Sequence, residues 1–411
     1  MTHSVVRIVV AGGNYAGLSA LKQLYATLLA TPSRQANVQI TMVDRRDGFL
    51  HYIGMTRGIT EPEFGSRLWV PYVTVDWLRD PQITIKQDRV TEIQPEFVQL
   101  AGGERLEFDY LVVALGQSRH GPIGVAANCK REFVGELAKS YEQLRAAKSV
   151  TVVGGGAVGI EMAADIKSDF PEKAVTLVHS RALPLPGPFK DEFRSSVVRI
   201  LRDEIGVDLV LGQRVVSQNP ASADMMNQEK HEPESVSATA SSATLTLGNG
   251  HMLQSDWAVR CLGTFDKRGV VNLPSSTDEP VFGGNGIRVK DTMQIDDPKY
   301  PNIYACGDIC NRDQVKLAGV AMHGAYIAAT NIARSVLSAS PTLEQSARFP
   351  PKILLLLGKS HFIMQLGDEI WEREKTQQYV SDDMSLRGCV EALSMHQPPE
   401  AISAFDSPQT Y

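Results

Sequence analysis

The stretch "VVAGGNYAGLSAL" at residues 9–21 decides the fold, because it joins an apolar run to a glycine turn and then to apolar residues at helical spacing. A continuous apolar run of this kind is typical of a buried parallel strand. Dinucleotide-binding turns between such a strand and a helix read G-x-G-x-x-G. Gly12 and Gly17 occupy the first and third glycine positions, whereas Asn14 replaces the second. The stretch therefore predicts a nucleotide-binding turn with one substituted position.

The next strand, "NVQITMVD", ends on Asp44. An acid at this position binds a ribose 2′-hydroxyl, which the adenosine of FAD carries. Asn14 is compatible with such a site, since asparagine tolerates unusual backbone angles and its amide can donate toward phosphate. The helix N-terminus supplies further N–H groups. We therefore expect the turn to hold the pyrophosphate of FAD through Gly12, Gly13, Asn14, Tyr15, Ala16 and Gly17.

The same order of elements returns about 140 residues later, which predicts a second dinucleotide-binding unit in a domain of its own. In "GGGAVGIE" the motif is complete, with Gly154, Gly156 and Gly159 between an apolar strand and a helix. The first glycine makes the turn, the second admits the pyrophosphate, and the third brings the helix against the strand.

The strand after the second turn ends in His179, Ser180 and Arg181 rather than in an acid. Without a carboxylate to repel a 2′-phosphate, and with Arg181 available to pair with it, the sequence favours NADPH and leaves NADH open. The alternative for Arg181 is an exposed surface arginine.

Composition excludes several classes of protein. The chain has 411 residues, 43% hydrophobic and 21% charged, with a net charge of -6, which indicates a globular protein of two or three domains and no basic face for nucleic acid. No apolar run approaches the ~18 residues of a membrane span, and the N-terminus lacks a signal peptide and a Met-Gly start. We therefore expect a cytoplasmic protein without a stable membrane anchor.

The five cysteines are too few for a disulfide scaffold and form no metal-ligand cluster, so no metal site is expected. Cys306 and Cys310 are interpreted as buried free thiols. The redox pairs of disulfide reductases, C-x-x-C or C-x-x-x-x-C, do not occur. Disulfide reduction is therefore excluded as the activity.

The predicted fold is α/β, with two Rossmann-like dinucleotide-binding domains and a small C-terminal α+β unit. Residues 219–244 are poor in large apolar side chains and predict a mobile insertion between two strands. The predicted domains are an FAD domain at 1–122 and 286–345, an NAD(P)H domain at 123–285, and a C-terminal unit at 346–411, which is also a candidate homodimer contact.

As an ordered set, the two turns, "VVALG" at 112–116 and "YACGD" at 304–308 resemble the two-dinucleotide-binding-domain flavoproteins, in particular the apoptosis-inducing-factor-like branch that includes the ferroptosis suppressor quinone reductases. The resemblance covers roughly residues 5–340. It implies that the first unit holds FAD and the second NAD(P)H. The glycine turns after the strands become cofactor-contact candidates, at Ala114, Gly116, Gly263 and Gly307.

Further residues gain roles from the same resemblance. Asp308 would hydrogen-bond the flavin ribityl chain, Arg57 would contact the flavin, and the backbone of Val90 would meet the adenine. The alternatives are a surface ion pair for Arg57 and a strand core position for Val90. Glu161 would face nicotinamide and flavin, although an acid in the first helical turn is also favoured by the helix dipole.

Lys316 matches the lysine that would stabilise negative charge on reduced flavin, and His323 is a second catalytic candidate. A lysine at a helix start is otherwise usually solvated. The related type II NADH dehydrogenases carry glutamines around a quinone tunnel, where this helix has Gly319 and His323. Quinone use is therefore less firmly indicated than flavin use.

Together these residues predict an FAD-dependent NAD(P)H oxidoreductase that passes hydride to flavin and then electrons to a quinone or similar small acceptor. Two alternatives stay open. One is a redox sensor or interaction protein that binds both nucleotides and turns over poorly. The other is a flavoenzyme specialised for a dedicated metabolite.

Overall fold

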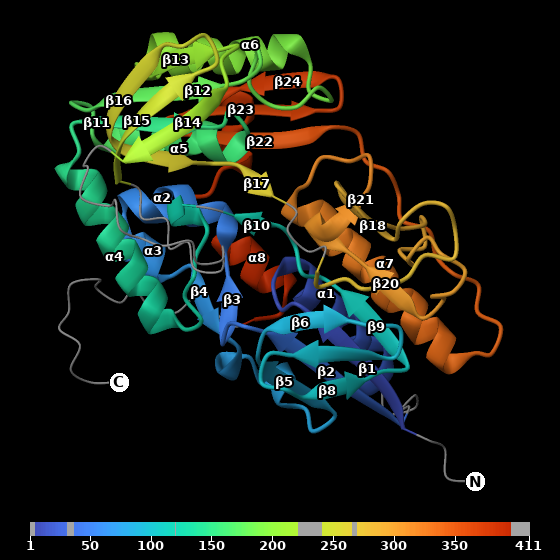
Figure 1. Cartoon of the computed structure of the whole chain (residues 1–411). Coiled ribbons are helices and arrows are strands. Elements are labelled where there is room, and N and C mark those ends of the chain that lie inside the picture. Colours follow the sequence, from blue (N-terminus) through green and yellow to red (C-terminus); the bar gives the residue numbers. More distant parts are fainter. Residues whose placement is uncertain (1–4, 31–36, 120, 221–240, 265–268, 396–411) are drawn as a thin grey trace.

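The computed structural model describes residues 5–30, 37–119, 121–220, 241–264 and 269–395. Two α/β bodies lie at opposite ends of the molecule, and the C-terminal residues, red in Figure 1, reach both of them. This arrangement confirms the predicted fold class. The domain limits themselves stay a prediction.

The first body is built on a parallel sheet whose central strand is buried, with Ile8, Val9, Val10 and Ala11 at most 2% exposed. Its five strands run in the order β20 (Ile303–Ala305), β9 (Tyr110–Val113), β1 (Val6–Ala11), β2 (Val38–Asp44) and β5 (Ile83–Gln87). Helix α1 (Tyr15–Leu24) packs against α7 (Ala318–Leu337), so segments about 300 residues apart share one core.

The second body has a mixed six-stranded sheet. The order is β13 (Asp208–Leu211), β12 (Ala174–His179), β11 (Ser149–Val153), β16 (Met252–Arg260), β15 (Ser241–Leu247) and β14 (Val215–Pro220). The three pairs among the first four strands are parallel, whereas β16 with β15 and β15 with β14 pair antiparallel. Helix α5 (Ala157–Asp169) follows β11, and α6 (Asp191–Arg199) follows β12.

The insertion predicted at 219–244 does connect two paired strands, β14 and β15. Its outer residues, 219–220 and 241–244, belong to those strands rather than to the insertion. Residues 221–240 lie outside the described residues, so the predicted mobility stays untested.

Smaller elements surround the two sheets. In the first body, β6 (Val90–Ile93), β7 (Phe97–Leu100) and β8 (Arg105–Glu107) form an antiparallel sheet, and β3 (Gly48–Leu50) pairs with β4 (Trp69–Pro71). Three helices contact one another, namely α2 (Met55–Thr60), α3 (Pro62–Ser66) and α4 (Lys130–Ala146). A third small sheet consists of β18 (Phe282–Gly283), β19 (Gly286–Arg288) and β21 (Cys310–Asn311).

The two bodies are joined by a short antiparallel pair, β10 (Ser118–Arg119) with β17 (Gly263–Thr264). A side chain at Gly263 would place its Cβ 2.9 Å from Oε1 of Gln117, so the glycine permits the close approach of the two chains. Gly263, predicted as a cofactor contact, therefore has a structural position between the bodies.

The C-terminal unit contains the sheet β22 (Lys352–Leu357), β23 (His361–Leu366) and β24 (Glu369–Glu372), followed by α8 (Leu386–Ala392). The strand β22 packs against α5 of the second body. In contrast, α8 lies beside α1 of the first body in Figure 1, where the Lys22 ammonium donates to the Ala392 carbonyl at 2.7 Å. The unit therefore bridges both bodies.

A hydrogen bond from His51 connects the first body to the C-terminal segment. This side chain is 0% exposed, and its Nε2 donates to the Met384 carbonyl at 2.9 Å. Since that bond places the proton on Nε2, Nδ1 accepts from the Tyr15 hydroxyl at 3.0 Å. Burial lowers the pKa of His51 to about 4, so the imidazole is neutral at physiological pH.

We predict that His51→Gln reduces the acid sensitivity of the fold. The pKa of His51 is about 4 in the folded chain and about 6.5 when unfolded. Its contribution is therefore complete above pH 6.5 and is lost as the pH falls toward 4, by about 3 kcal/mol in all. Unfolding free energies of both proteins at pH 7.5, 6 and 5 measure the difference in slope. Equal slopes would contradict a buried neutral His51.

Candidate functional site

The first nucleotide turn is shaped by direct backbone contacts. Gly12 has a φ of +107°, and a Cβ at Gly17 would lie 1.7 Å from the Gly12 carbonyl oxygen. Only glycines let α1 begin so close to β1. At the end of β2, Oδ2 of Asp44 accepts from the Gly13 N–H at 2.7 Å.

Asn14 acts differently from the sequence-based expectation. Its backbone is in the ordinary extended region, with φ −98°, so the position requires no glycine. Its Oδ1 accepts from the Tyr15 N–H at 2.8 Å as the cap of α1, and its Nδ2 donates to the Leu50 carbonyl at 3.0 Å. The amide thus fixes the turn, and the expected contact with phosphate stays a prediction.

The second turn repeats this geometry. Gly154 has a φ of +119°, and a Cβ at Gly159 would lie 1.8 Å from the Gly154 carbonyl oxygen. A Cβ at Gly156 would meet no atom within 4 Å, so this backbone faces open space. Nδ1 of His179 accepts from the Gly155 N–H at 3.0 Å, which is the role of Asp44 in the first turn. Burial, followed by the charges of Arg181 and Arg194, lowers the pKa of His179 and keeps the imidazole neutral.

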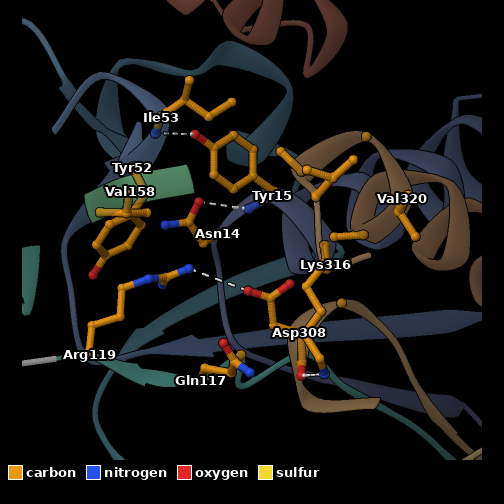
Figure 2. A pocket seen from close by; sticks show the side chains of 18 of the residues that line it. Asn14, Tyr15, Tyr52, Ile53, Gln117, Arg119, Val158, Asp308, Lys316 and Val320 are labelled. Atoms are coloured by element: carbon orange, nitrogen blue, oxygen red, sulfur yellow. Dashed lines mark hydrogen bonds and ion pairs between the residues drawn. The ribbon is translucent and has the colours of Figure 1, made fainter. Parts of the chain in front are cut away.

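A cavity of about 1380 Å³ opens between the first body, α5 and the C-terminal unit. Many predicted site residues line it: Gly12, Asn14, Tyr15, Ala16, Asp44, Val90, Ala114, Gly116, Glu161, Gly307, Asp308 and Lys316. Figure 2 shows Asn14 and Tyr15 across from Asp308 and Lys316. The size and the convergence of glycine backbone, Asp44 and Asp308 fit a dinucleotide such as FAD.

Other predicted residues fall outside the described lining of this cavity. Most of them are glycines of the two nucleotide turns, and the others lie at or just after the end of β12, or in β17. They are Gly13, Gly17, Gly154, Gly156, Gly159, His179, Arg181 and Gly263. The glycines of the second nucleotide turn therefore lie outside the described lining, and their contact with NAD(P)H stays a prediction. Glu161, two residues after Gly159, lies where α5 enters the cavity.

Three cavity residues were missed by sequence reasoning, namely Arg46, Tyr52 and Arg119. Nη2 of Arg119 lies 3.3 Å from Oδ2 of Asp308, and its guanidinium lies 4.6 Å from the Tyr52 ring centroid (Figure 2). Arg46 donates to the Tyr52 hydroxyl at 2.6 Å, and its buried Nε has no hydrogen-bond partner among the described residues. Two arginines facing the cavity suit the two negative charges of a pyrophosphate. Arg46 follows the end of β2 by two residues, and this position is the signal that could have found it. Arg119 lies within β10, where no such signal marks it.

Glu161 reaches the cavity from the first turns of α5. Its Oε1 accepts from the Leu356 N–H of β22 at 3.2 Å. Burial raises the pKa of Glu161 to about 8, and the like charge of Asp165 adds to the rise, while Leu356 and Arg57 oppose it. This carboxyl therefore carries a proton at neutral pH.

Lys316 lies just before α7 and lines the same cavity as Glu161. Its Nζ donates to the carbonyls of Asp308 at 2.6 Å and Cys310 at 2.9 Å, which holds the ammonium near the predicted ribityl contact. Burial lowers the pKa of Lys316, whereas Asp308 raises it. The arrangement gives a fixed positive charge at the cavity wall.

His323 does not line the cavity among the described residues. Its ring meets Phe349 edge-on, with centroids 4.9 Å apart and an interplanar angle of 81°. Phe349 itself lines the cavity. The predicted catalytic histidine thus supports an aromatic wall residue, and its pKa is lowered by burial.

Arg57, the predicted flavin contact, is also placed elsewhere. It is 8% exposed, its Nη2 donates to the Gly358 carbonyl at 2.9 Å, and the same atom lies 3.5 Å from Oδ1 of Asp165. The side chain therefore points into the junction of α2, α5 and the β22–β23 turn. Val90, at the start of β6, lines the cavity as expected.

We predict that Gly159→Ala and Gly156→Ala separate folding from nucleotide binding. The methyl group at 159 collides with the Gly154 carbonyl, so a loss of about 1–3 kcal/mol in unfolding free energy is expected. The methyl group at 156 meets open space, so stability is retained, but it occupies the approach of the pyrophosphate and weakens NADPH binding by about tenfold. Thermal melting and NADPH titration test the pair. Equal effects of both substitutions on binding and melting would contradict the assignment.

Two further features concern metals and membranes. Within the described residues, no group of three or more histidine, cysteine or carboxylate side chains is arranged to hold a metal ion. None of the helices in the described ranges has the length and apolar character needed to cross a bilayer. All five cysteines are free.

Comparison with known proteins adds the family. The profile described as "Pyridine nucleotide-disulphide oxidoreductase" matches residues 6–325. Ferroptosis suppressor protein 1 of Xenopus laevis is 30% identical, with 82% of each chain covered. Oxidoreductase OXR1 of Ajellomyces capsulatus is 28% identical over 96% of this chain and 88% of the relative. Apoptosis-inducing factor homolog B of Dictyostelium discoideum is 27% identical over 89% and 91%.

Solved structures show the same fold. The sulfide:quinone oxidoreductase of Aquifex aeolicus has a TM-score of 0.66 at 15% identity, covering 95% of this chain and 92% of that one. The chain belongs to the pyridine nucleotide-disulphide oxidoreductase family, in the branch of the apoptosis-inducing-factor homologues and ferroptosis suppressors, and is an oxidoreductase that uses FAD and NAD(P)H.

Proposed function

We propose that this oxidoreductase passes electrons from NADPH, through FAD, to a quinone or a similar flat apolar acceptor. The observation that carries the proposal is the apolar part of the cavity, where the start of α7 faces the start of the C-terminal unit. Its lining there includes Leu317, Val320, Phe349, Pro350, Ile353 and Leu355. Such a wall, next to the protonated Glu161 and the fixed charge of Lys316, suits an apolar ring with polar oxygens.

FAD, when bound, would supply the redox chemistry between NADPH and the acceptor. The residues of the chain bind the cofactor and balance its charge. Gly12, Asp44 and Asp308 hold the dinucleotide, and Arg46 and Arg119 are placed to neutralise its phosphates.

Glu161 and Lys316 have separate tasks in this proposal. The protonated carboxyl of Glu161 donates a hydrogen bond or a proton to an acceptor oxygen, because its pKa of about 8 keeps the proton available at pH 7. The Lys316 ammonium stabilises negative charge that develops beside Asp308. His323 acts indirectly, by setting the position of Phe349.

NADPH is proposed over NADH because the strand end offers no carboxylate to a 2′-phosphate. His179 keeps the hydrogen bond to the Gly155 N–H without a negative charge, and Arg181 is exposed next to it. A homodimer through the C-terminal unit and a cytoplasmic location stay predictions without a structural test.

The function is tested by anaerobic titration of the purified protein with NADPH, following the flavin absorbance near 450 nm that a bound FAD would show. Bleaching that is reversed by ubiquinone-1 supports the proposal. A bleached flavin that no acceptor reoxidises rapidly would instead favour the redox-sensor function. Reoxidation by a non-quinone metabolite alone would favour the specialised flavoenzyme.

We predict that Arg181→Ala weakens NADPH binding by about tenfold or more and leaves NADH binding unchanged, since a charge-assisted contact is worth about 1.5–3 kcal/mol. Stopped-flow reduction at varied nucleotide concentration gives both dissociation constants. Arg202→Ala, at another exposed basic position of the same body, is the control. A parallel loss of affinity for both nucleotides would contradict a 2′-phosphate contact.

We predict that Lys316→Ala retains FAD and slows turnover by about 10²-fold, the usual scale for losing one preorganised charge. Asp308→Ala, by contrast, should lower FAD retention during dialysis, because the cavity loses the expected ribityl contact. Absorbance ratios and steady-state rates separate the two effects. Full turnover in Lys316→Ala would remove its catalytic role.

A further inference from the structure

Helix α5 carries three carboxylates spaced four residues apart, Glu161, Asp165 and Asp169. Side chains at this spacing share one helix face, with Cβ atoms about 5–6 Å apart. Glu161 lines the cavity, and Asp169 lies at the far end of the helix, where its Oδ1 meets Nζ of Lys359 at 2.6 Å. The Lys359 side chain is 55% exposed. This acidic row therefore leads from the cavity to solvent.

Asp165, the middle carboxylate, is fully enclosed. Its side chain is 1% exposed, and one oxygen, Oδ1, faces the Arg57 guanidinium at 3.5 Å. The other oxygen, Oδ2, is buried and accepts no hydrogen bond of normal geometry from the described residues, although the neighbouring Thr56 hydroxyl lowers the pKa of this carboxyl. A buried carboxylate oxygen of this kind is satisfied by water or by a proton.

The proposed reaction needs a path for protons from solvent to the cavity. NAD(P)H releases two electrons and one proton as hydride, whereas a quinone takes up two electrons and two protons to become a hydroquinone. One proton per turnover must therefore come from water. On this side the cavity is walled by β22, which packs against α5 and donates the Leu356 N–H to Glu161.

We propose that Asp165 is a proton carrier between solvent at the Asp169–Lys359 pair and Glu161, an inference that rests on the proposed quinone-type acceptor. The O–H bond of Glu161 breaks as a new O–H bond forms on the acceptor oxygen. The resulting carboxylate takes a proton from Asp165 through one bridging water, and Asp165 regains its proton from solvent. Each turnover moves one proton inward.

The charges around this row support the direction of transfer. Burial raises the pKa of Asp165 to about 6 and that of Glu161 to about 8, so a proton moves from Asp165 to Glu161 downhill. Arg57 from α2 lowers the pKa of both carboxyls, and Asp169 raises that of Asp165. At the outer end, Lys359 bridges Glu61 at 2.9 Å and Asp169 at 2.6 Å.

The test uses the FAD-loaded chain with Asp165→Asn, which keeps size and removes the proton-carrying oxygen. Flavin reduction by NADPH should keep its wild-type rate, whereas reoxidation by ubiquinone-1 and the proton uptake seen by a pH indicator should slow by about tenfold or more. The solvent isotope effect on reoxidation should increase. Glu172→Gln, an exposed acid just after α5 with a side chain 70% exposed, is the control.

A second measurement covers the case in which Asp165→Asn leaves Arg57 unpaired and the chain unstable. The double variant Arg57→Gln with Asp165→Asn removes both charges and should show the same slow proton uptake. Infrared titration of the FAD-free chain should show two carboxyl groups that titrate well above the surface acids, one of which disappears in either variant.

The outcomes separate the two proposals. Wild-type reoxidation and proton uptake in folded Asp165 variants would overturn the carrier role while leaving Glu161 as the acid. Failure of ubiquinone-1 to reoxidise the wild-type flavin would overturn the proposed function itself, and with it the need for a second proton. Slowed flavin reduction in Asp165→Asn would mean a structural role and would also overturn the carrier role.

Discussion

The buried Arg57 guanidinium is the interaction on which the cavity depends. It joins three parts of the chain, because α2 supplies the arginine, α5 supplies Asp165, and the β22–β23 turn supplies the Gly358 carbonyl. A buried charge without partners costs several kcal/mol, so these three parts are stable only together. Gly358 permits the contact, since its φ is +67° and a Cβ there would lie 2.0 Å from Oγ of Ser168. The wall beside Glu161 therefore lies where these three parts dock together.

The two nucleotide turns show how one backbone geometry serves two ligands. Each strand end provides an acceptor for the N–H of the residue after the first glycine, Asp44 for Gly13 and His179 for Gly155. The imidazole preserves this hydrogen bond and removes the negative charge. The turn can therefore stay rigid while the electrostatic preference for the ribose substituent changes. Asn14 likewise preserves the geometry of its turn with a different residue type, because its extended backbone needs no glycine and its side chain caps the helix.

Features set by neighbouring residues could be predicted from the sequence, and features set by distant pairing could not. The strand, turn and helix around Gly12 and Gly154 follow from periodicity and from the need for close backbone approach. Arg57, however, pairs with a residue 108 positions away and with a carbonyl 301 positions away. Arg119 meets Asp308 across 189 positions. Periodicity carries no information about such partners, so the sequence could suggest that Arg57 is functional but not which group it contacts.

The role of the C-terminal unit could not be predicted from sequence patterns, yet the unit forms the wall of the cavity that is proposed to meet the acceptor. The strand β22 supplies apolar side chains such as Ile353 and Leu355 to the wall, while its Leu356 N–H binds Glu161. That N–H favours the ionised carboxylate and so limits the rise in pKa that burial causes. One strand therefore sets both the shape of this wall and the acidity of the group beside it. Because both properties depend on how β22 docks against α5, the proposed function implies that changes in this unit would alter acceptor choice and proton supply together, without any change in the two nucleotide turns.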